Sequence, residues 1–238
     1  MSESSNLLFY YSCLSINNYQ GVKMLIAKYV VSIISITTLS ACMVVKASAA
    51  DGGDISSVLG GIKVASGQVA GDLDSVNGSI KIGNNAKAED VEAVNGSVKI
   101  GKSVTLRSVA TVNGRISAGQ GLTVVKSVET VNGRISLDSG SEVGGDVSTV
   151  NGGIELDGVT VSGDLSTNNG NIELQSTTVK GDIEVKKSKG WFNSDSDDNP
   201  VISIDATSKV GDIHLYREVK LEISEQAKVG QVIYHYKD

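Results

Sequence analysis

One short phrase of sequence returns at a nearly constant interval along this chain. Residues 111–118 read Thr-Val-Asn-Gly-Arg-Ile-Ser-Ala, and close variants of the phrase stand around six asparagines: Asn77, Asn95, Asn113, Asn132, Asn151 and Asn169. The steps between these asparagines are 18, 18, 19, 19 and 18 residues. A fixed period in this range is typical of solenoids, in which one coil cannot bury its apolar face without a neighbouring coil.

Each repeat also carries an aliphatic pair that predicts a short strand. The pair begins at Ile62 and Val64 and recurs nine times, ending at Leu221 and Ile223. Apolar residues at i and i+2 are typical of a strand with one buried face. Between residues 76 and 124 an apolar residue also falls at every sixth position. Three six-residue sides therefore make one 18-residue coil, and a coil of 19 needs one bulged residue.

These patterns predict an all-β fold, a single-stranded parallel β-helix (β-solenoid) of triangular cross-section with about nine coils of 18–19 residues. We place it at residues 51–238. We expect it to be right-handed, because left-handed hexapeptide helices prefer a small residue where Ile80 and Ile116 stand. The Asn-Gly pairs are interpreted as corners, since both residues tolerate positive φ. The chain has 27 glycines, one proline and 4% aromatic residues, which favours stacked aliphatic rows over one globular core.

Two segments depart from the period. Ile172 and Ile202 are 30 residues apart, so residues 186–199 (KKSKGWFNSDSDDN) are expected to be a loop inserted at one corner. Insertions in solenoids often lie on a functional face. The last segment, 214–238, is expected to cap the final coil. The candidate interaction residues of the inserted loop are Trp191, Phe192, Asp195, Asp197 and Asp198.

The first fifty residues have the layout of a secretory signal. Residues 29–41 form an apolar and hydroxyl run that follows Lys28, and small residues come after it. Met24 is the natural start of this signal, so residues 1–23 are interpreted as a mis-annotated upstream extension and 24–50 as the signal peptide. Two processing routes stay open. Residues 39–42 resemble a bacterial lipobox with Cys42 as the lipidated residue, or the signal is cut near residues 49–50.

The exported part offers little that points to catalysis, metal binding or a cofactor. It has no cysteine beyond Cys42, which excludes disulfides and cysteine-based metal sites there. His214 and His235 lie in no recognisable motif. The aspartates that recur at one corner are explained by a repeated structural phrase. Removal of residues 1–50 leaves 18 basic against 26 acidic residues, which argues against nucleic acid as a partner. We therefore expect no catalytic residue, no metal site and no cofactor.

A column of threonines beside the repeated asparagines has two interpretations. An outward ladder of such residues could order water, as in ice-binding solenoids. Alternatively, the hydroxyl groups satisfy backbone polar atoms at the corner. The residues of the column are Thr111, Thr130, Thr149 and Thr167.

A second phrase, Val-x-Gly-Asp followed by an aliphatic residue, stands at 69–73, 143–147, 161–165 and 179–183, with a shortened form at 210–213. With its aliphatic pairs, the chain resembles the bactofilin, or polymer-forming cytoskeletal, type of β-helix over residues 54–232. The resemblance implies a right-handed β-helix without enzymatic activity that assembles end to end. The chain departs from that family in its export signal and in its Asn-Gly phrases.

The sequence thus leads to two functional hypotheses. The first is a non-enzymatic β-solenoid, exported to the periplasm or anchored at the outer membrane of a Gram-negative bacterium, that acts as a structural scaffold or as an adhesion or interaction module. Its expected contacts are the membrane through Cys42, other copies end to end, and an unknown protein or glycan. The alternative is a carbohydrate-binding or carbohydrate-active β-helix that uses Trp191.

Overall fold

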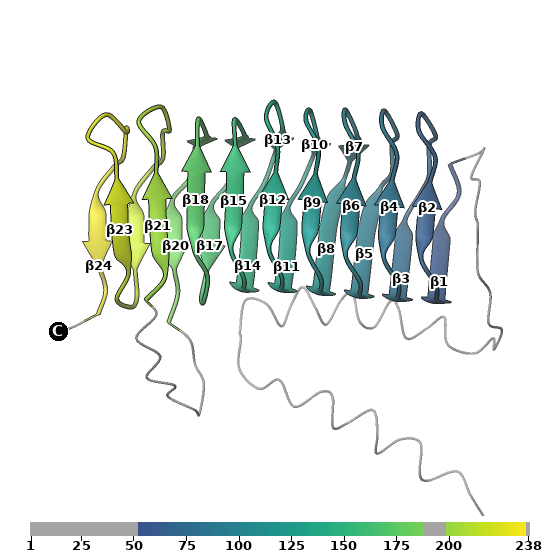
Figure 1. Cartoon of the computed structure of the whole chain (residues 1–238), viewed down its shortest axis with the longest axis horizontal. Coiled ribbons are helices and arrows are strands. Elements are labelled where there is room, and N and C mark those ends of the chain that lie inside the picture. Colours follow the sequence, from purple (N-terminus) through teal and green to yellow (C-terminus); the bar gives the residue numbers. More distant parts are fainter. Residues whose placement is uncertain (1–51, 188–198, 237–238) are drawn as a thin grey trace, which may run out of the picture. The chain divides into compact units, whose positions relative to one another are not determined.

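The computed structural model describes residues 52–187 and 199–236, and these residues form 24 β-strands in three parallel sheets (Figure 1). Strands of one sheet come from successive coils, so each sheet is one side of the coil. The all-β parallel solenoid that the period predicts is confirmed. Within the described residues no helix is long and apolar enough to span a membrane.

Side one is a ten-stranded sheet whose strands follow one another in chain order. Its strands are β1 (Ile55–Leu59), β3 (Leu73–Asn77), β5 (Asp90–Asn95), β8 (Ser108–Asn113), β11 (Val128–Asn132), β14 (Val147–Asn151), β17 (Leu165–Thr167), β20 (Ile183–Val185), β22 (Ile213–Leu215) and β24 (Val232–Tyr234). Coils one to nine are counted from β1 to β22, and β24 begins a tenth.

Side two has nine strands, one for each complete coil. They are β2 (Ile62–Val64), β4 (Ile80–Ile82), β6 (Val98–Ile100), β9 (Ile116–Ala118), β12 (Ile135–Leu137), β15 (Ile154–Asp157), β18 (Ile172–Gln175), β21 (Val201–Ile204) and β23 (Lys220–Ile223). The nine predicted aliphatic pairs are these nine strands, and the predicted number of coils is confirmed.

Side three is the shortest of the three sides. Its five strands are β7 (Thr105–Leu106), β10 (Thr123–Val124), β13 (Glu142–Val143), β16 (Thr160–Val161) and β19 (Thr178–Val179). Isolated bridges extend the same ladder by two coils toward each end, through Val69 and Lys87 and through Lys209 and Lys228. Three sides per coil agree with the predicted triangular cross-section. The handedness of the helix stays a prediction.

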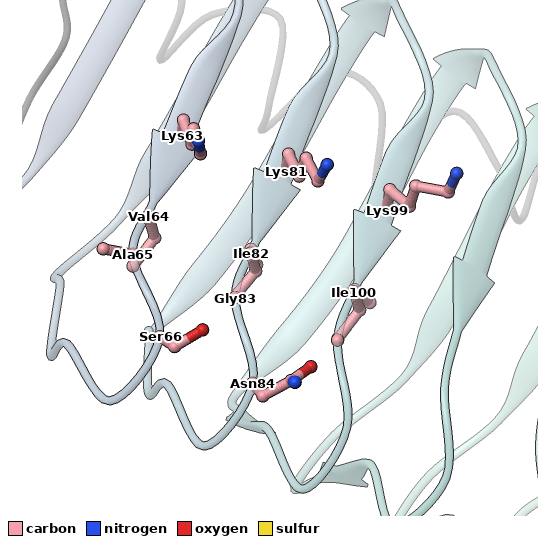
Figure 2. A pocket seen from close by; sticks show the side chains of 11 residues that line it. Lys63, Val64, Ala65, Ser66, Lys81, Ile82, Gly83, Asn84, Lys99 and Ile100 are labelled. Carbon is pink, nitrogen blue, oxygen red and sulfur yellow. The ribbon is translucent and has the colours of Figure 1, made fainter.

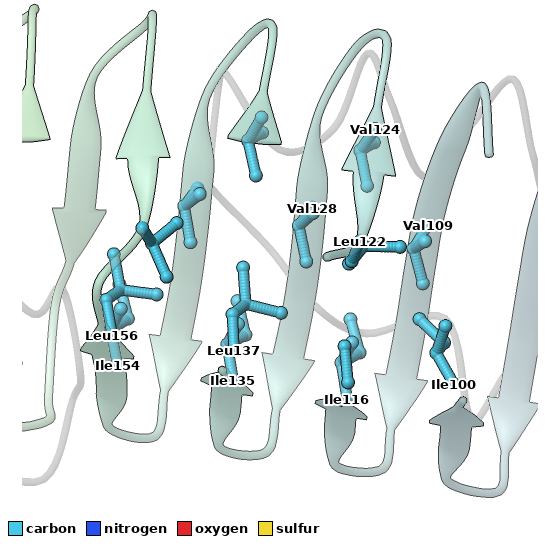
Figure 3. Packing of buried hydrophobic residues seen from close by; sticks show 14 of the residues in the cluster. Ile100, Val109, Ile116, Leu122, Val124, Val128, Ile135, Leu137, Ile154 and Leu156 are labelled. Atoms are coloured by element: carbon cyan, nitrogen blue, oxygen red, sulfur yellow. The ribbon is translucent and has the colours of Figure 1, made fainter. Parts of the chain in front are cut away.

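Stacked rows of aliphatic side chains fill the interior of the coils. Ile116 pairs with Ile135, which pairs with Ile154, and each of the three is at most 1% exposed (Figure 3). Complete burial of one such side chain stabilises a fold by about 1.5–3 kcal/mol. Because each row is shared between neighbouring coils, this stabilisation belongs to the stack and not to a single coil.

The valines before Asn-Gly lie on the outer face of side one and outside the aliphatic core, although Val76, Val94 and Val112 belong to the apolar series at every sixth position. Strand residues alternate between faces. In β8 the inward residues are Val109 and Thr111, so Val112 points outward and is partly exposed. Counting every sixth residue matched the coil length but missed this alternation.

Val69 also departs from its predicted place. In the ladder of side three Val69 pairs with Lys87, and its side chain is 51% exposed. The buried residue of that coil is Ala70, at 3% exposure. The valine of the first Val-x-Gly-Asp phrase is therefore one residue out of register with the valines of the later phrases. The residue of this coil that is equivalent to Val210 is Ala70.

Most of the expected C-terminal cap continues the stack. Strand β22 pairs with β20, β23 with β21, and β24 with β22. The described part of 214–238 therefore forms the ninth coil and one strand of a tenth. At this end Leu221, Ile223 and Val232 are only partly buried. The expected insertion at 186–199 lies largely at 188–198, outside the described residues.

Close stacking, and not positive φ, is the reason for the glycine of each Asn-Gly pair. Among the described residues, positive φ outside glycine occurs at Asn85, Ser103 and Ser176, none of them a repeated asparagine. A Cβ added to Gly133 would overlap the carbonyl oxygen of Gly114 in the preceding coil. The same overlap with the preceding coil would arise along the column at Gly78, Gly96, Gly114, Gly152 and Gly170.

The first prediction tests this contact. Gly133→Ala should lower the free energy of unfolding by about 1–3 kcal/mol, because the added methyl group forces two coils apart. Gly53→Ala is the matched control, since a Cβ at Gly53 meets no atom within 4 Å. Thermal and urea unfolding of both variants measure the effect. Equal stability of the two variants would show that the coils are not in close contact at this corner.

Candidate interaction surface

The repeated asparagines form a continuous hydrogen-bonded ladder along one corner of the stack. From Asn95 onward, the Nδ2 group of each asparagine donates to Oδ1 of its counterpart in the preceding coil, over 2.8–3.1 Å. At the far end, Nη1 of Arg217 donates to Oδ1 of Asn169 over 2.7 Å. The corner prediction for these six residues thus gains a physical reason: each amide joins two coils.

The repeated aspartates form a second ladder at another corner. Oδ1 of Asp164 accepts the backbone N–H of Asp182 over 2.9 Å, and Oδ1 of Asp182 accepts that of Asp212 over 2.8 Å. The same contact joins Asp54 to Asp72, Asp72 to Asp90, Asp146 to Asp164 and Asp212 to Gln231. A carboxylate that accepts a backbone N–H is stabilising in its charged form.

The glycine of the Val-x-Gly-Asp phrase makes room for this contact. A Cβ at Gly181 would overlap Oδ1 of Asp164, and a Cβ at Gly211 would meet Oδ1 of Asp182. The phrase is therefore a device for joining coils, in which glycine admits the carboxylate of the preceding coil.

The threonine column is buried and bonds to the backbone. Thr130, Thr149 and Thr167 are at most 4% exposed, and their hydroxyl groups donate to the carbonyl oxygens of Gly114, Gly133 and Gly152. A buried hydroxyl group cannot order surface water. Of the two interpretations of this column, the structure supports backbone satisfaction.

One cluster of potential metal ligands comes together at the C-terminal end of side one. Asp182, Asp212 and His214 each offer a ligand atom, and these atoms lie within 4.8 Å of one another. Nδ1 of His214 lies 3.0 Å from Nε2 of His235, whose ring stacks on Tyr216 at a centroid distance of 4.3 Å. One oxygen of each carboxylate already accepts a backbone N–H. Sequence reasoning missed this cluster because Asp182 and Asp212 are separated by the insertion.

Side one of the first three coils is strongly acidic. Residues 54–59, 72–77 and 89–95 contain no Lys or Arg and six carboxylates: Asp54, Asp72, Asp74, Glu89, Asp90 and Glu92. Arg107, at the start of the next coil, contacts part of this group. Its Nε lies 2.8 Å from Oδ1 of Asp90, and its Nη2 lies 3.4 Å from Oδ1 of Asp72.

Burial, together with neighbouring charges and hydrogen bonds, shifts the pKa of three of these carboxyl groups. Burial raises the pKa of Glu92 to about 7, and the charges of Asp74 and Asp90 add to the shift. Burial likewise raises the pKa of Asp74, with Asp72 adding to the effect. For Asp90 burial acts in the same direction, but hydrogen bonds from Arg107 and Ser108 outweigh it and lower the pKa. Side one therefore carries a concentrated negative charge that one arginine neutralises only in part.

Sides two and three of the same coils are basic. Residues 61–71, 78–88 and 96–106 contain no Asp or Glu and five lysines: Lys63, Lys81, Lys87, Lys99 and Lys102. Three of them pair in register on the outer face of β2, β4 and β6, Lys63 with Lys81 and Lys81 with Lys99. They line a groove of about 550 Å³ together with Ser66, Gly83, Asn84 and Gly101 (Figure 2). We call Lys63, Lys81 and Lys99 the lysine column.

The lysine column is the candidate binding feature that sequence reasoning missed. The sequence did contain a signal for it. The three lysines are spaced 18 residues apart, and each lies between the two aliphatic residues of a strand pair. The predicted interaction residues Trp191, Phe192, Asp195, Asp197 and Asp198, and the lipidation candidate Cys42, lie outside the described residues.

The second prediction concerns Glu92. The pKa of Glu92 in the folded protein, about 7, lies above its ordinary value of 4.5, so folding favours the protonated form and stability falls as the pH rises between these values. Glu92→Gln removes the charge, and should be more stable than the original protein at pH 8 by up to about 3 kcal/mol. The difference should vanish near pH 4.5. Unfolding curves across this pH range measure it.

Glu142→Gln, on the exposed side of β13, is the control for removal of a carboxylate at the surface. A stability difference for Glu92→Gln that does not change with pH would contradict the assignment of a raised pKa to Glu92.

Comparison with known proteins places the repeat in a recognised family. The family model described as Toastrack DUF4097 matches residues 90–235. The match begins in coil three, whereas the first strand of the solenoid, β1, starts at Ile55. No curated protein and no solved structure matches the chain. The expected β-helix of repeated coils is confirmed, and the bactofilin assignment is not. Because the match spans more than half of the 238 residues, the protein belongs to the Toastrack DUF4097 family.

Proposed function

We propose that the protein is a non-enzymatic binding scaffold of the bacterial cell envelope. In this proposal it is exported from the cytoplasm of a Gram-negative bacterium and presents the outer faces of its coils to an envelope partner. It is held at the outer membrane through lipidated Cys42, or released to the periplasm after cleavage near residues 49–50. The mass of the mature N-terminal peptide distinguishes these two routes.

The observation that carries the proposal is the separation of charge between the faces of coils one to three. Six carboxylates gather on side one and five lysines on sides two and three, without mixing. Stability alone favours mixed charges, because like charges on neighbouring strands repel. A face of one sign instead attracts and orients a partner of the opposite sign.

The hydrogen bonds between coils support a non-enzymatic role. A general acid or base must exchange a proton with a substrate that it can reach. In the aspartate ladder, Asp164 and Asp182 each use one carboxylate oxygen to accept a backbone N–H of the next coil. The asparagine amides bond to one another along their corner. The repeated polar residues thus have structural tasks that account for their presence without catalysis.

We also propose that copies of the protein associate end to end, and the strands at the two ends of the solenoid limit this association. Among the described strands, side one ends with β24 in a tenth coil, whereas side two ends with β23 in the ninth. If β1 of a second copy paired with β24, its β2 would have no side-two strand to pair with in the tenth coil. Because the described strands of two copies cannot then pair on all three sides, we propose short oligomers and not long filaments.

The third prediction addresses assembly. Light scattering and small-angle scattering of the purified protein should give a mass of one to a few copies over a wide range of concentration. The uneven end at β24 is the reason. Growth to filaments as the concentration rises would contradict the proposed mismatch between the ends and would favour a bactofilin-like assembly.

The fourth prediction tests the scaffold function itself. Purified protein mixed with isolated cell envelopes should sediment with them at low ionic strength, and much of it should be released near 1 M salt, where charges are screened beyond about 3 Å. Heat-unfolded protein of the same sequence is the control, since it has the same net charge without the separated faces. Failure of the folded protein to sediment with envelopes, at any ionic strength, would refute the proposed function.

A further inference from the structure

The three ammonium groups of the lysine column have no partner within the described residues. Other charged side chains do pair: Arg134 contacts Glu155 and Lys186 contacts Glu184. No ion pair and no hydrogen bond in the described part of the chain involves the side chain of Lys63, Lys81 or Lys99, and all three residues are exposed. Within the described part of the chain, the column is therefore a row of three uncompensated positive charges.

The geometry of the column is linear and regular. Because the three lysines occupy equivalent positions on β2, β4 and β6, they follow one another at the strand spacing of about 4.8 Å. Figure 2 shows the three side chains on consecutive strands, with Ser66 and Asn84 at the turns that follow. A groove of about 550 Å³ runs across these coils and includes the backbone of Gly83 and Gly101.

Like charges in register on adjacent strands repel each other and destabilise a sheet. The column contains two such pairs, and no carboxylate lies on sides two and three of these coils to offset them. A bound ligand with a negative charge opposite each lysine would remove this repulsion. The energetics of the column thus point to an anion that repeats at the strand spacing.

The column has a defined length. After Lys99 the same register position holds Ser117 and Ser136, and then Glu155 and Glu173. The hydroxyl groups could still donate hydrogen bonds, but the glutamates would repel an anionic chain. Arg115 adds one positive charge beside Ser117. The favourable footprint therefore covers coils one to four and excludes coils six and seven.

We propose that the lysine column binds a linear anionic glycan, with the polymer chain along the axis of the coils and one carboxylate or other acidic group opposite each lysine. An extended polysaccharide advances per sugar by a distance close to the strand spacing, so successive acidic sugars stay in register with successive coils. This inference rests on the proposed envelope function and names the chemical class of the partner. Two of the three lysines, Lys63 and Lys81, lie before the family match at 90–235.

The groove favours a single chain over a membrane surface. A flat bilayer could contact the ends of the three lysine side chains, but it would not fill a groove that runs between Lys63 and Gly101. A narrow polymer reaches both the ammonium groups and the polar atoms of Ser66 and Asn84. Anionic vesicles are therefore the competing probe in the experiment.

The test measures binding of the purified protein to oligogalacturonates of increasing length by calorimetry at low ionic strength. Affinity should rise with each added sugar up to about four and then level off, because the favourable footprint ends in coil four, with Arg115 beside Ser117. Changing Lys63, Lys81 and Lys99 together to Gln should weaken binding about tenfold or more. Ser117→Lys, which extends the column by one coil, should strengthen it severalfold.

The matched control changes Lys180, Lys209 and Lys228 to Gln, which removes the same charge from exposed positions in coils seven to nine. It should leave binding within about twofold. The inference is overturned if the two triple variants lose affinity equally, if methyl-esterified oligomers bind as well as the free acids, or if phosphatidylglycerol vesicles alone bind in a lysine-dependent way. Envelope binding that survives the loss of the lysine column would overturn the glycan inference and leave the scaffold function intact.

Discussion

Successive coils approach so closely at the Asn-Gly corner that no side chain fits between them, and the rest of the structure depends on this contact. A Cβ at Gly133 or Gly152 would overlap the glycine carbonyl of the preceding coil. The contact fixes the register of neighbouring coils, and the register in turn aligns every column. The aliphatic rows, the asparagine ladder and the aspartate ladder all follow from this alignment. Stability is then a sum over neighbouring coils.

The same alignment decides where function can reside. Inward positions hold aliphatic residues or buried hydroxyl groups such as those of Thr149 and Thr167, and corner positions are used to join coils. Outward positions of the strands are the ones that can vary without disturbing the stack. In the first three coils, these positions and the residues next to them are acidic on side one and basic on the other two sides. Regular spacing turns such substitutions into charged columns, which a single surface residue could not provide.

Much of the fold could be predicted from the period, and the failures have physical causes. The 18-residue step identified the coils, their number and the strand pairs such as Ile80 and Ile82. It could not orient Val112, because the coil period says nothing of the alternation within a strand. It gave the wrong reason for the repeated glycines, since closeness between coils is a property of the stack. The meeting of Asp182, Asp212 and His214 depends on how the chain continues after an insertion, which no local pattern records. The lysine column was visible in the spacing of Lys63, Lys81 and Lys99 but was not recognised from the sequence.

The most direct test of this account is amide hydrogen exchange at the aspartate corner. The backbone N–H groups of Asp164, Asp182 and Asp212 lie at the surface, yet each donates to a carboxylate of the preceding coil. The account predicts that these amides exchange slowly, with protection that approaches that of the central strands and declines toward the ends of the stack. Exchange as fast as that of an exposed turn residue such as Ser66, whose N–H is not hydrogen-bonded within the described residues, would contradict it. The repeated carboxylates would then be available for chemistry, and the assignment of function to the outer charged faces would lose its basis.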